Sequence, residues 1–296
     1  MVPIRSDIIK WEVIKITPDY VSMMSAAKND ICYAIKSWKT VLTSILKENL
    51  IYAYAKGSAL KKWETEIDYV PILSDLDIHV KLKQGNEILN GHTNPLEKSI
   101  ELNSLYQMDY ERSNPNIFHY PRPQVMVINK LETSVSYIPP LLSDVHLIYG
   151  TPKSLGDDKY DSEVLRELDY NNLIKEKEPL DVLPERLIDR SGLDFWTLLR
   201  SISWKVSPIP VRMLTQITDE DYTPVEAWRW NRTTIESYLL KTGFTTIASN
   251  YREYYLTGWE LYLDGFKSEE LYRKIIKLGY SVIRDCIIEG QNLHNS

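Results

Sequence analysis

The spacing of apolar residues changes once along the chain, near Gly150. Before that point helical spacings are interrupted by short β-prone runs, and residues 77–82 alternate polar and apolar side chains with a period of two. Such alternation is typical of a strand with one buried face. After Gly150 the apolar stripes have helical spacing. The chain is therefore predicted to be α+β, with a mixed-sheet domain over residues 1–155 and an all-α helical bundle over residues 156–296.

The first half is predicted to run helix, strand, strand, helix, strand, strand. Thr17 is the predicted N-cap of the first helix, with Pro18 at its first position, where the missing N–H costs nothing. The predicted helices cover residues 17–47 and 95–112, and the predicted strands cover residues 50–55, 77–82, 124–131 and 145–149.

The second half is predicted to be helical nearly to its end. Ser268 is expected to cap the last helix and Gly290 to end it. The acidic segment 157–169 is interpreted as a solvated connector or the first helical edge. The predicted helices cover residues 194–205, 224–241, 246–263 and 268–289.

The net charge and the cysteine content indicate which partners and which cellular compartment suit this chain. The formal charge is −6, from 41 acidic and 35 basic residues, so no overall positive field attracts long nucleic acid or anionic lipid. Neither a signal-peptide pattern nor an apolar run of about 18 residues is evident. Cys32 and Cys286 lie in apolar helical patterns and are predicted to be buried free thiols. We therefore expect a cytoplasmic protein without a membrane partner.

One segment carries a pattern with recognisable chemistry. Asp75 and Asp77 are separated by one residue in a predicted strand, so both carboxylates leave the same face. Two neighbouring carboxylates repel each other unless a divalent cation lies between them, and Mg²⁺ takes carboxylate and phosphate oxygens. Upstream, Gly57 allows the backbone to approach a phosphate closely, and Ser58 adds a hydroxyl and an N–H. A helix beginning there would direct its positive end at the anion.

These residues resemble the motif of the nucleotidyltransferase superfamily with the polymerase-β-like fold. That family has a Gly-Ser pair at the start of a helix and an acidic-x-acidic pair on the next strand, which Gly57-Ser58 and Asp75-x-Asp77 match. Lys61 falls where many members place a basic residue. The resemblance covers roughly residues 20–150, and the helical region behind it is similar in layout to antibiotic nucleotidyltransferases. It implies that Asp75 and Asp77 bind Mg²⁺ and are catalytic, and that Gly57, Ser58 and Lys61 contact the nucleoside triphosphate.

The chain departs from the family pattern at two places. The spacer between Ser58 and Asp75 has sixteen residues, 59 to 74, which is longer than usual. The family normally places a third carboxylate on a neighbouring strand, where it helps to deprotonate the acceptor. In this chain Gln124 or Asn129 stands there, and Glu132 and Asp144 are the candidate substitutes.

Each candidate residue also has a plain structural interpretation. The acidic pair can be a charged strand edge facing water, and Lys61 and Lys62 a solvated surface. His79 is expected to be partly buried with a structural hydrogen bond. Trp228 and Trp230 are expected to pack inward with the arginines of the 228–232 segment outside, although they also fit a base-stacking surface. Arg200 and Lys205 are expected to be surface charge, with contact to a triphosphate as the alternative.

Three functions follow as hypotheses. The first is a metal-dependent nucleotidyltransferase that moves a nucleoside monophosphate from a triphosphate to an acceptor hydroxyl. The second is a catalytically degenerate, nucleotide-binding or partner-binding (antitoxin-like) module of the same fold, because the third carboxylate is missing. The third is an α/β scaffold in which the acidic pair is accidental. The sequence indicates neither the acceptor, the preferred base nor the oligomeric state.

Overall fold

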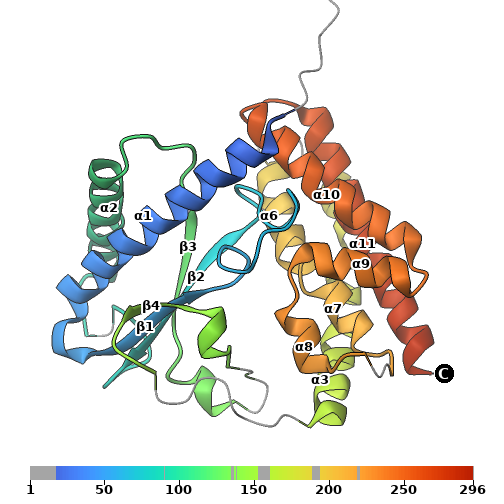
Figure 1. The fold of residues 1–296 in the computed structure, drawn as a ribbon, viewed down its shortest axis with the longest axis horizontal. Coiled ribbons are helices and arrows are strands. Elements are labelled where there is room, and N and C mark those ends of the chain that lie inside the picture. Colours follow the sequence, from blue (N-terminus) through green and yellow to red (C-terminus); the bar gives the residue numbers. More distant parts are fainter. Residues whose placement is uncertain are drawn as a thin grey trace, which may run out of the picture.

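The structure, a computed structural model, describes residues 18–89, 91–134, 137, 139–152, 161–188, 194–218 and 221–295. Over these ranges it is an α+β protein in which a mixed sheet stands beside a group of helices (Figure 1). The N-cap predicted at Thr17 and the boundary predicted at residues 155 and 156 lie outside the described residues. The extents of the two predicted domains therefore stay a prediction.

The sheet described here has four strands in the order β3-β2-β1-β4. Strand β1 pairs antiparallel with β2 and with β4, whereas β3 pairs parallel with β2. The expected mixed sheet is thus confirmed. The strands are β1 (Leu50–Lys56), β2 (Asp75–Leu82), β3 (Arg122–Val127) and β4 (His146–Tyr149).

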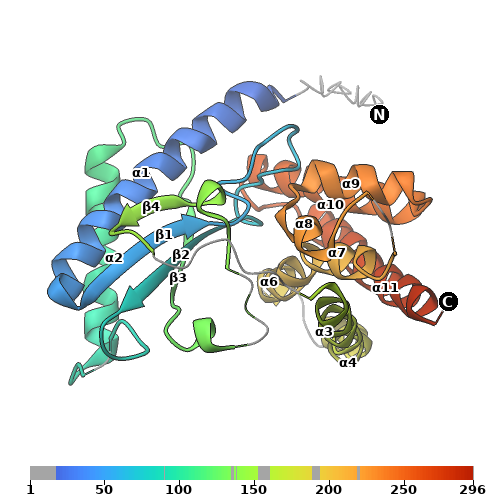
Figure 2. The ribbon, with the colours of Figure 1, turned by 60° about the horizontal axis from the view of Figure 1, so that its bottom comes forward.

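Two helices, α1 (Tyr20–Leu46) and α2 (Pro95–Ser113), pack on one face of this sheet (Figure 2). Asp19 caps α1, because its side chain accepts from the Ser22 N–H at 3.1 Å. Alternate residues of β1 and β2, such as Ala53, Ala55 and Ile78, enter the core with apolar residues of the two helices. The other face of the sheet is left to polar and aromatic side chains.

The remaining helices form a second hydrophobic core around α10 and α11. Within the described residues this core is built from aliphatic side chains together with Tyr251, Tyr254, Tyr255 and Trp259. The helices are α3 (Ser162–Ile174), α4 (Lys177–Asp181), α5 (Leu183–Ile188), α6 (Asp194–Val206), α7 (Ile209–Leu214), α8 (Pro224–Arg229), α9 (Arg232–Lys241), α10 (Thr245–Leu263) and α11 (Glu269–His294).

Several predicted boundaries are wrong for identifiable reasons. The helix predicted over 224–241 is divided, because the Asn231 side chain accepts from the Thr234 N–H at 2.8 Å and caps a new helix, α9. Gly290 does not end α11; it lies inside the helix, where an added Cβ would come within 2.3 Å of Leu173 Cδ2. This glycine permits close packing and does not act as a C-cap. The capping role of Ser268 is confirmed.

The strand predicted over 124–131 begins and ends earlier, as β3. Beyond its end the Asn129 side chain accepts from the Leu82 N–H at 3.0 Å and donates to the Leu82 carbonyl at 2.9 Å. Past the end of β3, the Asn129 side chain therefore forms the hydrogen bonds to β2 that a strand backbone would otherwise form. Of the two free cysteines, Cys286 is buried as predicted, but Cys32 is exposed, so its position on α1 is not the apolar face.

Candidate functional site

The polar face of the sheet collects the side chains that the sequence analysis singled out. Asp75, Asp77, His79 and Lys81 alternate with buried apolar residues along β2 and therefore share this face. The register places Lys56 of β1 and Gln124 of β3 on either side of Asp77. Asp75 and Asp77 both line a cavity whose other walls include residues of the helical bundle. The strand that carries them, β2, has α6 of the bundle beside it (Figure 1).

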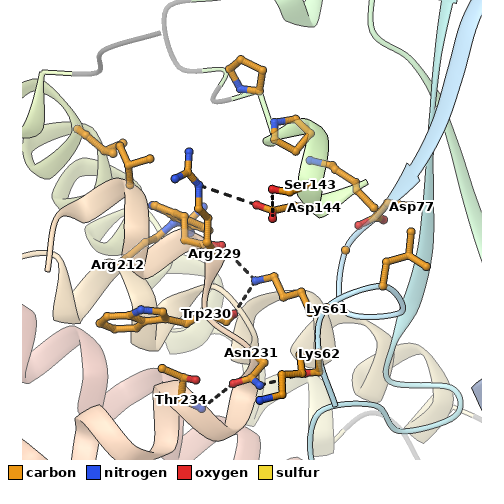
Figure 3. A pocket seen from close by; sticks show the side chains of 18 of the residues that line it. Lys61, Lys62, Asp77, Ser143, Asp144, Arg212, Arg229, Trp230, Asn231 and Thr234 are labelled. Atoms are coloured by element: carbon orange, nitrogen blue, oxygen red, sulfur yellow. Dashed lines mark hydrogen bonds and ion pairs between the residues drawn. The ribbon is translucent and has the colours of Figure 1, made fainter. Parts of the chain in front are cut away.

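A cleft of about 690 Å³ opens between Asp77 and the helices of the bundle (Figure 3). A second cavity of about 370 Å³ adjoins it, because both are lined by Gly57, Lys61 and Asp77, and Asp75 and Gln124 line the second one. Burial raises the pKa of Asp77, and the neighbouring charges of Lys56 and Lys61 oppose that shift. The two lysines thus offset only part of the cost of burying this carboxylate, and a cation bound beside it would offset more.

Gly57 forms a tight turn against Asp77. Its φ is +92°, and an added Cβ would stand 2.4 Å from Asp77 Oδ2. The Gly57 carbonyl accepts from the N–H groups of Leu60 and Lys61 at 3.0 and 3.2 Å. The chain then continues as turns, so the helix expected to begin at Ser58 is wrong. No helix dipole is available at this point for a phosphate, but Ser58 still lines the second cavity.

Gly57→Ala is expected to weaken magnesium-dependent binding of ATP at least ~10-fold, because the methyl group must displace the Asp77 carboxylate, and strain at positive φ adds about 1–3 kcal/mol. Isothermal titration calorimetry measures the binding. Gly243→Ala is the matched control, since Gly243 also has a positive φ of +88° but open space at its Cβ position. Equal binding by both variants would contradict a role for the Gly57–Asp77 contact.

Two arginine side chains lie next to the Asp75 carboxylate. The Arg122 guanidinium forms an ion pair with its Oδ1, and Arg200 Nη1 of α6 lies 4.0 Å from the same oxygen. Arg200 therefore reaches across from the bundle, and its interpretation as plain surface charge is wrong. Lys205 pairs with Glu176, away from Asp75. Sequence reasoning missed Arg122. The parallel pairing of β3 with β2 places Gln124 beside Asp77, and Arg122, two residues earlier, therefore lies beside Asp75.

The fold separates Gln124, which stands at the expected acidic position, from Glu132 and Asp144, the two candidate substitutes. Gln124 occupies the register position beside Asp77, where it offers an amide oxygen but accepts no proton. Glu132 bonds to Tyr52 and Lys81, and Lys81 stands roughly 13 Å along β2 from Asp77. Asp144 lines the large cleft with Asp77, with its Oδ2 4.0 Å from Arg229 Nε (Figure 3). Asp144 is therefore the substitute that the structure places in the same cleft.

Lys61 connects the sheet to the bundle. Its Nζ donates to the carbonyl oxygens of Trp228 at 3.1 Å and Trp230 at 2.6 Å, on the opposite wall of the cleft (Figure 3). Burial, together with the nearby positive charges of Arg232 and Lys56, lowers the pKa of Lys61 to about 8. Lys62 is exposed and pairs with Glu64 at 2.7 Å, which confirms the solvated interpretation for that residue.

The sixteen-residue spacer is fixed to the bundle along its length. Asp68 accepts from the backbone N–H groups of Glu64, Thr65 and Thr233, at 2.7, 3.1 and 2.9 Å. Ile67, Val70 and Leu73 are buried in the core of the bundle. The insertion therefore serves as a docking segment between the strand that ends at Lys56 and the one that begins at Asp75.

Arg232 holds this docking segment from the bundle side. It is 5% exposed and donates to the Ile67 carbonyl at 3.1 Å and to Ser74 Oγ at 2.9 Å, with its guanidinium 4.0 Å from the Tyr255 ring centre. The expectation that the arginines of this segment lie outside is thus wrong for Arg232. A buried arginine is not recognisable from helical spacing alone, because its acceptors, the Ile67 carbonyl and the Ser74 hydroxyl, belong to a segment distant in sequence.

The two tryptophans of the same segment pack as predicted. Trp228 donates from Nε1 to Asp169 Oδ2 at 2.9 Å, and Trp230 stacks on Tyr238 with ring centres 4.1 Å apart. Both also line the cleft. His79 is buried with its Nδ1 3.1 Å from the Tyr54 hydroxyl, and burial lowers its pKa to about 3, which confirms its structural interpretation.

The donor set fits a hard divalent cation in part. Asp75, Asp77 and the Gln124 amide supply oxygen atoms, which are the ligands that Mg²⁺ takes, and the remaining positions would fall to phosphate oxygens and water. In the described part of the chain no group of three or more His, Cys, Asp and Glu side chains is placed to hold a metal by itself. A metal at this site would therefore depend on a ligand that brings its own oxygens.

Two further observations lie outside the site itself. None of the helices that the structure describes is both long and apolar enough to cross a bilayer. Comparisons of the chain with models of known protein families, with curated proteins and with solved structures found no match.

Proposed function

We propose that the chain is a metal-dependent nucleotidyltransferase, which transfers a nucleoside monophosphate from a nucleoside triphosphate to a hydroxyl group. One observation carries the proposal: Asp75 and Asp77 protrude from one strand into a cleft, with the Gly57 backbone packed against the Asp77 carboxylate. Two carboxylates on one strand, next to a glycine turn, suit a divalent cation and the polyphosphate that it carries. The resemblance described above points to the same reaction.

Residues of this chain would share the work as follows. Asp75 and Asp77 would hold Mg²⁺, which when bound neutralises charge on the triphosphate. The Gly57 backbone packs against Asp77, and Ser58, which lines the second cavity, would offer its hydroxyl and N–H to a phosphate. Lys61 fixes the turn by its bonds to the bundle.

The reaction itself joins the acceptor oxygen to the α-phosphorus and breaks the bond to the β-phosphate, so that pyrophosphate leaves. The acceptor proton needs a base, and Asp144 lines the large cleft with Asp77. Two other carboxylates of that cleft are already engaged, because Glu64 pairs with Lys62 and Asp169 accepts from Trp228. The apolar and aromatic part of that cleft, which includes Trp228, Pro139 and Pro140, offers room for the acceptor.

A second candidate function is nucleotide or partner binding without transfer. It is favoured by Gln124, which stands beside Asp77 without proton-accepting ability, and by Arg122, which pairs with Asp75. Titration calorimetry with ATP, with and without Mg²⁺, tests binding by either function. Pyrophosphate release, measured with an aminoglycoside, an RNA 3′ end and a serine-containing protein as acceptors, separates them. Binding without release favours the second candidate. If ATP does not bind with or without Mg²⁺, the transferase is rejected, and so is the nucleotide-binding form of the second candidate.

Gln124→Asp is expected to raise pyrophosphate release at least ~10-fold, because a carboxylate beside Asp77 adds a proton acceptor and general bases contribute about 10²–10⁴-fold. The rate is measured with the acceptor that gives turnover, or with all three if the wild type gives none. Gln107→Asp, an exposed change on α2, is the control. An unchanged rate in Gln124→Asp would show that Gln124 does not stand at the position of the base.

A further inference from the structure

The arginines beside Asp75 are the feature of the site that the proposed function leaves unexplained. Arg122 stands directly opposite Asp75 in the parallel register and pairs with its Oδ1. Arg200 approaches the same oxygen from the bundle at 4.0 Å. The Asp75 side chain is 17% exposed, so solvent screens these charges only in part. One carboxylate is thus surrounded by two guanidinium groups.

These guanidinium groups retain donors that nothing in the described structure accepts. Arg122 Nε and Arg200 Nη2 are buried without a hydrogen-bond partner among the described residues. A buried donor left unpaired costs free energy, and an arginine can offer two parallel N–H groups to a phosphate. The pair of arginines therefore has unused capacity for an anion at the point where Asp75 would meet a metal-bound polyphosphate.

Arg122 and a divalent cation compete for the same oxygen atom. The guanidinium supplies the positive charge that Asp75 would otherwise take from a metal ion, and the two cannot both contact Oδ1 without repelling each other. Gln124, the next residue of β3 that faces the same way, is uncharged and offers no alternative carboxylate to Arg122. When a cation takes Asp75, the freed guanidinium becomes available to an anion that arrives with that cation.

We propose that Arg122 is an exchange residue, which neutralises Asp75 in the free protein and transfers to a phosphate of the incoming metal–triphosphate complex. The inference rests on the proposed function, because it assumes that Asp75 binds the metal. The exchange makes Mg²⁺ and the triphosphate bind cooperatively. The metal alone displaces Arg122 from Asp75 and leaves its guanidinium without an anion, whereas the metal–triphosphate complex supplies a phosphate with which Arg122 pairs. Cooperativity of this kind is reciprocal between the two ligands.

Calorimetry with Mn²⁺ alone, and then with Mn²⁺ and α,β-methylene-ATP, tests this exchange without any need for turnover. Arg122→Gln is expected to bind Mn²⁺ alone at least ~10-fold more tightly than the wild type, because the competing charge is gone. The same variant should lose most of the enhancement that the nucleotide gives to Mn²⁺ binding. Arg122→Lys keeps the charge and should remain within about twofold of the wild type in Mn²⁺ affinity.

Arg112→Gln is the matched control, since Arg112 also pairs with an aspartate, Asp109, but is 80% exposed on α2. Circular dichroism checks the fold, and Arg122→Met, which keeps an unbranched stem, replaces Arg122→Gln if that variant unfolds. Equal Mn²⁺ affinity in the wild type and Arg122→Gln overturns the exchange and leaves the proposed function standing. If neither protein binds Mn²⁺ with or without the nucleotide, the proposed function fails as well.

Discussion

Asp77→Asn is expected to reduce the affinity for ATP in the presence of Mg²⁺ at least ~100-fold, which corresponds to about 2.7 kcal/mol. Asparagine keeps the shape of the side chain but removes the charge that a hard cation requires. Asp75→Asn is expected to have a similar effect on binding. Titration calorimetry measures the affinity, and any pyrophosphate release found for the wild type should disappear in both variants.

The fold of Asp77→Asn should remain intact. Burial raises the pKa of Asp77, so the charged carboxylate costs more in the folded than in the unfolded protein, and a neutral side chain relieves that cost. Thermal unfolding of Asp77→Asn is therefore expected at or above the wild-type temperature. Asp181→Asn, an exposed change on α4, is the control for binding. Wild-type binding by both Asp75→Asn and Asp77→Asn would reject the proposed metal site.

Asp30→Ala is expected to lower the free energy of unfolding by about 3–5 kcal/mol, the usual cost of removing one partner of a buried charged network. Asp30 on α1 is fully buried and accepts hydrogen bonds from Asn114 Nδ2 at 2.6 Å, from the His119 N–H at 2.7 Å and from the Phe118 N–H at 3.1 Å. His119 Nδ1 lies 2.8 Å from the same carboxylate. Urea unfolding followed by circular dichroism measures the loss.

This network also predicts the response to acid. Burial by itself raises the pKa of Asp30, but the hydrogen bonds from His119 and Asn114 outweigh it, and the pKa lies below the ordinary value of 3.8. A lowered pKa contributes stability above the unfolded-state pKa and loses it as pH falls toward the folded-state value. The stability difference between wild type and Asp30→Ala should therefore shrink below about pH 4. Glu101→Ala, at an exposed pair with Lys98, should change stability by less than about 0.5 kcal/mol.

Periodicity predicted most elements because each is amphipathic by itself. The strand at Asp75–Leu82 and the helices α1, α10 and α11 follow this rule, whereas α2 leaves most of its aliphatic residues exposed. Periodicity failed at places where a side chain replaces backbone bonding or where a distant segment decides the packing. Asn129 ends β3, Asn231 divides α8 from α9, and Leu173 requires glycine inside α11 at position 290.

The site was predictable in part for a related reason. Two aspartates on one strand share a face whatever the rest of the fold, so Asp75 and Asp77 could be placed together from local geometry alone. The parallel register of β3 could not be predicted from local geometry. This register places Arg122 beside Asp75 and Gln124 beside Asp77. The expected helix at Ser58 is replaced by turns, and the spacer after it bonds to the bundle at Lys62 and Asp68. Such contacts between distant segments leave no local signal.

The spacer between Ser58 and Asp75 precedes the helical half in the sequence but has side chains buried in its core. Ile67, Val70 and Leu73 belong by sequence to the sheet half, yet they fill the interior of the helical half. A fragment that ended near residue 155 would present these aliphatic side chains to water, and a fragment that began there would have holes at the places they fill. Truncation at the apparent boundary would thus damage both pieces, and the acidic strand can be studied faithfully only within the uncut polypeptide.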